Sequence, residues 1–208
     1  RDSIVIGPKH TPDGVDWAVA PHDRWLISES AEIAGDPELA KELAENIPGF
    51  ELDSLAHARE HGIEVQLPLM EKYCPDTKIA AVALNGGDIE SIEGAAKGLA
   101  EWIRDQEDPP LLVISSDMNH FADDEENRRR DRMALDALAT GDGEELLRVC
   151  GEESISMCGQ IPAALILMTI RELGLSLKSQ EIAYATSADA GADPNRVVGY
   201  AGVIWVSG

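Results

Sequence analysis

Short apolar runs alternate along the chain with longer amphipathic stretches. Several runs are almost continuously apolar and end at Gly, Pro, Asn or Ser, which is typical of strands buried on both faces. Strands are predicted at 4–6, 78–84, 111–114, 181–185 and 197–206, the last of them long and apolar enough to be central. Residues 11–35 contain scattered Pro and Gly, which predicts a long loop with one short strand near 25–27.

The amphipathic stretches predict helices between these strands. Asp36 and Asp88 stand where N-caps are expected, and Gly174 where a C-cap is expected. Helices are predicted at about 36–46, 59–73 with a kink at Pro68, 89–105, 123–139, 143–149 and 163–173. The mixed-charge residues 123–132 are expected to form a solvated face.

Strands that alternate with helices of ten or more residues indicate an α/β fold. We predict a largely parallel or mixed central sheet with helices on both faces. No Pro-rich, Gly-rich or low-complexity segment marks a linker, so residues 1–208 are predicted to form a single domain.

Composition and charge narrow the classes of function. The net charge of −22, from 39 acidic and 17 basic side chains, disfavours binding to nucleic acid and to anionic membranes. No apolar stretch is long enough to span a bilayer, and no signal-peptide pattern is present, so we expect a cytoplasmic protein. Three cysteines, an odd number, do not suggest a disulfide framework and are expected to be reduced.

Candidate chemistry gathers at the ends of two predicted strands. His10 and His120 each follow an apolar strand, and parallel strands would open both imidazoles onto one edge of the sheet. Asp117 lies beside His120 and is suited to orienting an imidazole. His61 follows Glu60 in a run that combines ionisable and apolar residues. Each histidine taken alone is more typical of an ordinary surface or core residue, so the argument rests on their number.

Cys158 precedes Gly159 at a predicted helix start, where the positive end of the helix dipole favours a thiolate. The alternative is a small buried residue with an inert thiol. Other classes of site have no support, since the chain has no dinucleotide or phosphate-binding glycine loop, no nucleophile turn and no zinc-type cysteine pairs.

Four motifs together resemble the Memo family, whose bacterial and archaeal members are called AmmeMemoRadiSam system protein B. They are Gly7-Pro8-Lys9-His10, Glu60-His61-Gly62-Ile63-Glu64-Val65-Gln66-Leu67-Pro68, Ser115-Ser116-Asp117-Met118-Asn119-His120 and Met157-Cys158-Gly159. The family is similar in fold to LigB-type class III extradiol dioxygenases. The resemblance implies that His10, His61 and Cys158 surround a metal, and that Asp117 and His120 line the same pocket as catalytic residues.

Two features depart from the family pattern. The upstream strand with a Pro-His-Ala-Gly type motif is not present, so N-terminal residues of the family are expected to be missing. Gln160 and Ile161 replace the usual Arg and His after the Cys-Gly pair.

The leading hypothesis is a metal-binding protein with a His10, His61 and Cys158 site, holding iron or copper for redox or dioxygenase-like chemistry. A third option is a hydrolytic site with a zinc-activated water, which calls for a harder ligand set than two imidazoles and a thiolate. The alternative is a non-catalytic scaffold whose pocket binds a small molecule, a peptide, or a radical-SAM or AMMECR1-type partner protein.

Overall fold

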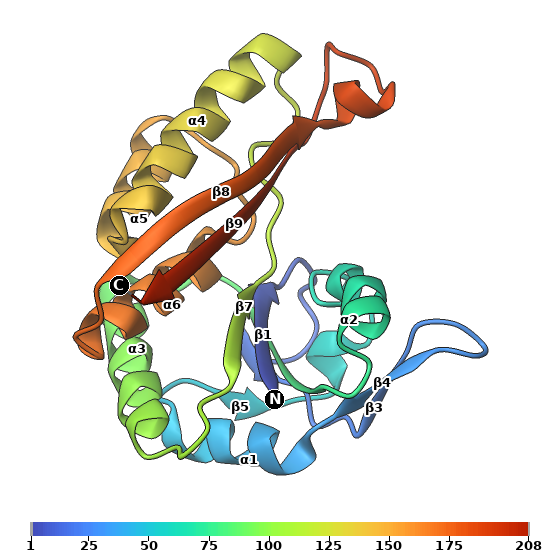
Figure 1. The fold of residues 1–208 in the computed structure, drawn as a ribbon, viewed down its shortest axis with the longest axis vertical. Coiled ribbons are helices and arrows are strands. Elements are labelled where there is room, and N and C mark those ends of the chain that lie inside the picture. Colours follow the sequence, from blue (N-terminus) through green and yellow to red (C-terminus); the bar gives the residue numbers. More distant parts are fainter. Residues whose placement is uncertain (1, 208) are drawn as a thin grey trace. The chain divides into compact units, whose positions relative to one another are not determined.

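A seven-stranded mixed sheet organises the N-terminal half of the chain in this computed structural model, which describes residues 2–207 (Figure 1). Its main path has the strand order β3-β4-β6-β1-β7, and β2 and β5 are attached beside β6. The strands are β1 (Ser3–Pro8), β2 (Trp17–Val19), β3 (Arg24–Leu26), β4 (Glu32–Gly35), β5 (Glu51–Leu52), β6 (Lys78–Leu84) and β7 (Leu111–Ile114). The apolar runs predicted as strands are thereby confirmed as β1, β6 and β7.

Strand β1 is an inner strand of the parallel part of this sheet. It pairs in parallel with β6 on one side and β7 on the other, so that Val5 lies opposite both Ala81 and Val113. Strand β4 is also parallel to β6, whereas β2 runs antiparallel to the end of β6. The predicted mixed, largely parallel α/β sheet is confirmed. The segments that follow β1 and β7 consequently start from the same sheet edge.

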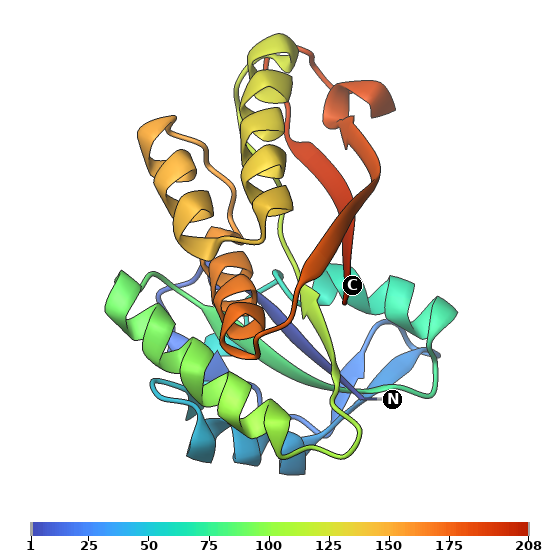
Figure 2. The same cartoon turned by 60° about the vertical axis from the view of Figure 1, so that its left-hand side comes forward.

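Helices cover both faces of this sheet. Helices α1 (Pro37–Asn46) and α3 (Ile89–Arg104) pack against each other, as Figure 2 shows, and α1 also packs on β6. On the other face, α2 (Leu67–Tyr73) and the turn before it bury Ile63 and Leu67 against Val5. The predicted caps are confirmed, because the side chains of Asp36 and Asp88 each accept a hydrogen bond from a first-turn amide.

The prediction of a long loop at 11–35 is wrong in part. This segment contains β2, β3 and β4, of which only β3 near 25–27 was expected. Each strand has only three or four residues, which is too short for an alternating pattern to stand out. Trp17 and Trp25 anchor them by being buried.

The chain divides into two compact units, Arg1–Ser115 and Ser116–Gly208. The second unit contains α4 (Asp124–Thr140), α5 (Gly143–Glu152), α6 (Gln160–Glu172), β8 (Leu177–Thr186) and β9 (Gly199–Ser207). Short 3-10 turns lie at Leu55–His57 and Glu64–Gln66 in the first unit and at Ser187–Ala190 in the second. The single-domain prediction rests on the lack of a linker sequence and stays a prediction.

The expectation that the last strand is central is wrong. Strand β9 forms a two-stranded antiparallel sheet with β8, and α4 packs on this hairpin. Its run of apolar residues covers both faces of the strand, but Tyr200, Ile204 and Val206 are exposed. Gly174 takes a left-handed φ of 71° after α6, which confirms the predicted C-cap.

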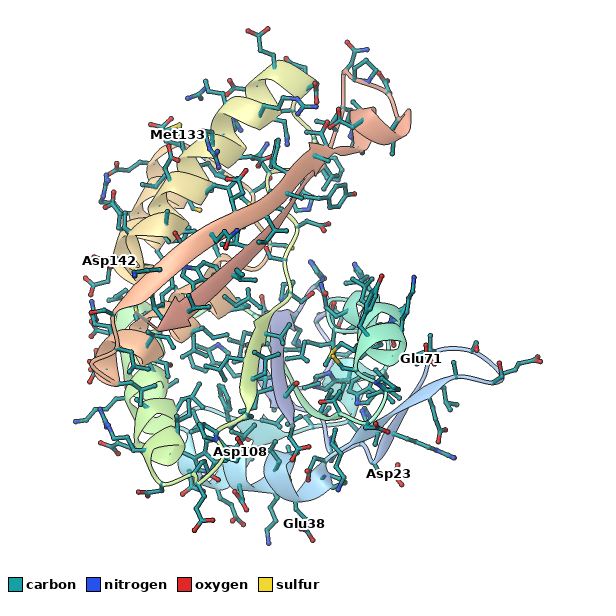
Figure 3. All side chains as sticks on the ribbon, in the orientation of Figure 1. Asp23, Glu38, Glu71, Asp108, Met133 and Asp142 are labelled. Atoms are coloured by element: carbon teal, nitrogen blue, oxygen red, sulfur yellow. The ribbon has the colours of Figure 1, made fainter. Side chains whose placement is uncertain are left out.

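Charged side chains project from the surfaces of both units. Four that Figure 3 labels, Asp23, Glu38, Asp108 and Asp142, are exposed. Within residues 2–207, no helix combines the length and the hydropathy needed to cross a bilayer.

Candidate functional site

Glu60 is the centre of the polar cluster in the first unit. Its side chain is fully buried, and its two oxygens accept hydrogen bonds from five donors. The Oε1 atom accepts from His10 Nδ1 at 2.8 Å and from the amides of His61 and Gly62 at 2.9 Å. The Oε2 atom accepts from the amides of His10 and Thr11. Glu60 thus joins the segment after β1 to the segment before α2.

The run that carries His61 is not the continuous helix that its pattern predicts. It is irregular up to Ile63, forms a 3-10 turn at Glu64–Gln66, and becomes helical at Leu67. Pro68 lies in the first turn of α2, where its missing N–H costs nothing, and therefore does not kink a longer helix. The Glu60 carboxylate supplies acceptors for amides that a helix would otherwise have to satisfy.

Gly62 allows the two segments to approach closely. A Cβ atom at this position would lie 2.6 Å from the carbonyl oxygen of Pro8 and 3.3 Å from Glu60 Oε1. Any side chain would therefore force β1 and the 60–62 turn apart. The small residue sets the distance between His10 and His61.

The imidazoles of His10 and His61 stack on each other. Their ring centroids are 4.8 Å apart, and their planes differ by 11°. One potential ligand atom each of His10, Glu60 and His61 lies within 4.8 Å of the others. Because Nδ1 of His10 is bound to Glu60, its Nε2 is the nitrogen left for a metal. Both imidazole rings are exposed, so their free edges are accessible.

The electrostatics of Glu60 favour a role in orienting the His10 imidazole rather than in binding a metal directly. Burial alone would raise the pKa of its carboxyl, but the hydrogen bonds from His10 and from the backbone amides outweigh burial and lower the pKa to about 2. The carboxylate is therefore charged, and its lone pairs are already used by five donors. A buried carboxylate that fixes one imidazole nitrogen is the usual outer partner of a metal-bound histidine.

In the second unit, Asp117 and His120 form a close pair. His120 Nε2 lies 3.5 Å from Asp117 Oδ2, and His120 Nδ1 donates to the carbonyl oxygen of Ser156 at 2.6 Å. The hydrogen bond to Asp117 is the main cause that raises the pKa of His120, and burial opposes it. Both ring nitrogens face acceptors, so the protonated imidazolium is favoured. His120 is thereby prepared to donate a proton.

Cys158 lies next to this pair in the same unit. Its Sγ accepts a hydrogen bond from the amide of Asp117 at 3.2 Å, and Ser116 Oγ lies 3.8 Å away. Helix α6 begins at Gln160, close to the predicted start, but burial raises the pKa of the Cys158 thiol in spite of these donors. The thiolate expected from the helix dipole is thus opposed by burial, and metal binding would have to release the thiol proton.

A buried polar network that the sequence did not indicate holds the Asp117–His120 loop. The Asp131 carboxylate, completely inaccessible to solvent, accepts from the Asn119 amide at 2.7 Å, from Asn127 Nδ2 at 2.9 Å and from the Tyr184 hydroxyl at 2.7 Å. Asn119 Oδ1 in turn accepts from the amide of Ser156. The expectation that 123–132 is a solvated face is therefore wrong for Asn127 and Asp131, which point inward from α4.

The predicted site residues fall into two groups. His10 and His61 come together in the first unit, and Asp117, His120 and Cys158 come together in the second. The combined ligand set of His10, His61 and Cys158 joins residues of both units and stays a prediction. Glu60 and Ser156 were missed as site residues, although Glu60 directly precedes a predicted ligand in the sequence.

Comparison with known proteins gives the family of this chain. The sequence model of the family described as Memo-like protein matches residues 2–204. The chain belongs to the Memo-like protein family. The sequence resemblance is thereby confirmed, and the mixed sheet with its helices is consistent with the expected fold.

Curated relatives from distant organisms cover almost all of this Memo-family chain. A MEMO1 family protein of Sulfurisphaera tokodaii is 31% identical over 202 residues, which are 96% of this chain and 70% of that protein. Those of Aquifex aeolicus and Archaeoglobus fulgidus are also 31% identical, over 98% and 97% of this chain and over 74% and 75% of their own lengths. Their names state the family and no activity.

Proposed function

We propose that this Memo-family chain is a metal-binding protein whose site is built on His10 and His61. The observation that carries the proposal is the buried, charged Glu60, which holds His10 Nδ1 at 2.8 Å while the ring stacks on His61. This arrangement fixes the tautomer of His10 and directs Nε2 outward. Burying a carboxylate and stacking two imidazoles costs free energy, and a bound cation would offset that cost.

The proposed third ligand is Cys158, and the proposed ion is iron or copper, with zinc as the redox-inactive alternative. Two imidazoles and a thiolate form a softer donor set than the two imidazoles and carboxylate of ordinary oxygenase iron. An iron or copper ion supplies one-electron redox chemistry, which supports a redox or dioxygenase-like activity. This ligand set follows the Memo resemblance.

The protein's own contribution to such a reaction is proton transfer and orientation. Asp117 lies 3.5 Å from His120 Nε2, raises the pKa of the imidazole and fixes the ring, which favours a proton on Nε2. The Ser156 carbonyl keeps Nδ1 occupied, so Nε2 is the only nitrogen of His120 that exchanges a proton with a substrate. We therefore propose His120 as proton donor and Asp117 as its orienting partner.

Equilibrium binding of Fe(II), Cu(II) and Zn(II) to single variants tests the ligand set. His10→Ala, His61→Ala and Cys158→Ser should each lose the tight site while the far-ultraviolet circular dichroism stays unchanged. His22→Ala and Cys74→Ser are matched controls, because they remove the same kinds of side chain elsewhere in the first unit and should bind as the wild type does. Wild-type affinity in His61→Ala would overturn the proposal.

A non-catalytic binding protein is the second candidate function. It is favoured by a groove of about 740 Å³ in the first unit, whose lining includes Asp16, Trp17, Glu51 and Glu90. Its acidic side chains suit a basic peptide or partner protein. A folded wild-type protein that takes up none of the three ions, yet binds a partner equally well after His10→Ala and Cys158→Ser, would favour this function over metal binding.

A further inference from the structure

A solvent-facing surface next to the Asp117–His120 pair is left unexplained by the metal-site proposal. The loop of residues 118–121 pairs antiparallel with residues 197–199, and His120 lies opposite Val198. On this second segment Val197 and Gly199 are buried, while Arg196 and Tyr200 are exposed on the alternating face. Tyr200 has the same strand alternation as Val198, which lies opposite His120, and Arg196 reaches this surface through the ring of Phe121 beside His120.

Phe121 forms the floor of this surface at a conformational cost. Its φ of 68° places it in the left-handed region, which a bulky residue adopts only under strain. The residue is 62% exposed, so it contributes little to the core. The ring nevertheless lies against the guanidinium of Arg196, 4.3 Å from its central carbon, and its centroid is 5.6 Å from that of His120. A strained, exposed aromatic residue of this kind is typical of functional surfaces.

Arg196 is exceptional among the arginines of the second unit. Across the described residues 116–206, each other arginine forms an ion pair with Asp or Glu, namely Arg128, Arg129, Arg130, Arg132, Arg148 and Arg171. The guanidinium of Arg196 instead has the Phe121 ring as its partner. In a chain with 39 acidic residues and a net charge of −22, a guanidinium kept apart from carboxylates is available to an external anion.

We propose that Arg196, held on the ring of Phe121, binds the carboxylate or phosphate group of the small molecule on which His120 acts. The inference rests on the proposed catalytic pair, since it names the class of substrate for that pair. Stacking occupies one face of the guanidinium and leaves its N–H edge free for a bidentate contact with an oxyanion. The remainder of the molecule would then extend along the exposed face toward His120 and Asp117.

Tyr200 completes this recognition surface on the side of Asp117. Burial, and then the negative charge of Asp117, raise the pKa of its phenol, so the hydroxyl keeps its proton at neutral pH. The phenol is therefore available as a neutral hydrogen-bond donor. A cation, a neutral donor and an aromatic ring on one face suit a compact anionic compound better than a cationic or purely apolar one.

Calorimetric titration with sodium benzoate and with inorganic phosphate tests the proposal on the full chain. Wild type should bind at least one probe saturably, and Arg196→Gln should bind it about tenfold or more weakly because charge-assisted hydrogen bonds are lost. Arg196→Lys keeps the charge without the planar fork and should fall between the two. Arg24→Gln is the matched control, since Arg24 is exposed on β3 of the first unit, and it should bind as the wild type does.

The outcomes separate this inference from the metal-site proposal. Binding of benzoate alone identifies a carboxylate site, and binding of phosphate alone identifies a phosphate site. Wild-type affinity in Arg196→Gln, or no saturable binding of either probe to the wild type, overturns the oxyanion site. Metal content measured on the same samples is independent, because Arg196→Gln should retain it. A wild type that binds a probe but no metal would contradict the metal site and leave the oxyanion site standing.

Discussion

At the scale of single residues, Glu60 connects the sequence to the proposed chemistry. Without it, four backbone amides would lose an acceptor, and His10 Nδ1 would lose the partner that fixes the ring. Its position directly before His61 means that one turn supplies both an imidazole and the carboxylate that orients the other imidazole. A change at Glu60 should therefore affect metal binding as well as stability.

Replacing Glu60 with Gln should weaken metal binding by about 10–100-fold, the usual effect of removing a carboxylate that orients a ligand. The amide of Gln would also place a donor against donors from the His61 and Gly62 backbone. Competition with a chromophoric chelator measures the affinity. Glu64→Gln is the control, because Glu64 is exposed in the same segment. Equal losses in both variants would refute a specific role for Glu60.

His57 should make folding stability depend on pH between about 4 and 6.5. Burial is the main cause that lowers its pKa from 6.5 to about 4, and its Nε2 lies 3.2 Å from the Ala18 carbonyl oxygen. Within that window the unfolded chain binds a proton that the folded chain does not, so stability is complete above pH 6.5 and is lost toward pH 4.

Chemical denaturation of the wild type and His57→Gln at several pH values tests this dependence. One such group contributes at most about 1.4 kcal/mol per pH unit, and this part of the slope should disappear in the variant. Parallel stability profiles for the two proteins would show that His57 is not its source.

At the scale of elements, helix α4 holds the Asp117–His120 loop through Asp131. Replacing Asp131 with Asn puts an NH₂ group where a carboxylate oxygen accepted hydrogen bonds from Asn119, Asn127 and Tyr184. Donors would then face a donor in a buried place, which should cost about 1–3 kcal/mol of stability. Asp136→Asn on the same helix changes an exposed carboxylate and should cost no more than about 0.5 kcal/mol. Urea denaturation measures both, and similar values for the two variants would contradict the network.

The elements that the sequence predicted correctly carry their own local signals. Strands β1, β6 and β7 are continuous apolar runs, and α1 and α3 begin at Asp caps that the structure contains. The 59–73 run was wrongly predicted to be one helix. The Glu60 side chain accepts from the amides of His61 and Gly62, and it is held there by His10, 50 residues away in sequence. The prediction that β9 is a central strand failed because an apolar sequence does not specify whether a strand pairs on one edge or on two.

At the scale of the whole molecule, the net charge of −22 should make stability depend on ionic strength. Repulsion among carboxylates opposes the folded state, and salt screens it over a Debye length of about 10 Å at 0.1 M. The midpoint of thermal unfolding should therefore rise between about 0.05 and 0.5 M sodium chloride. A midpoint that falls would mean that the surface ion pairs of α4 and α5 outweigh the repulsion.

The candidate site could be predicted in its residues but not in its supporting contacts. His10, His61, Asp117, His120 and Cys158 stand in motifs that a family resemblance identifies. The roles of Glu60, Ser156 and Asp131 depend on partners far along the chain, at separations of 50 residues for Glu60 and His10 and 36 for Ser156 and His120. Such pairings arise from tertiary folding, which local patterns do not encode.

Metal content by mass spectrometry on tag-free protein purified without oxygen is the most direct test of the central claim. The account predicts close to one equivalent of iron or copper in the wild type and its loss in His61→Ala, with both proteins folded. A well-folded wild type that contains no metal, and takes up none when iron, copper or zinc is supplied, would contradict it.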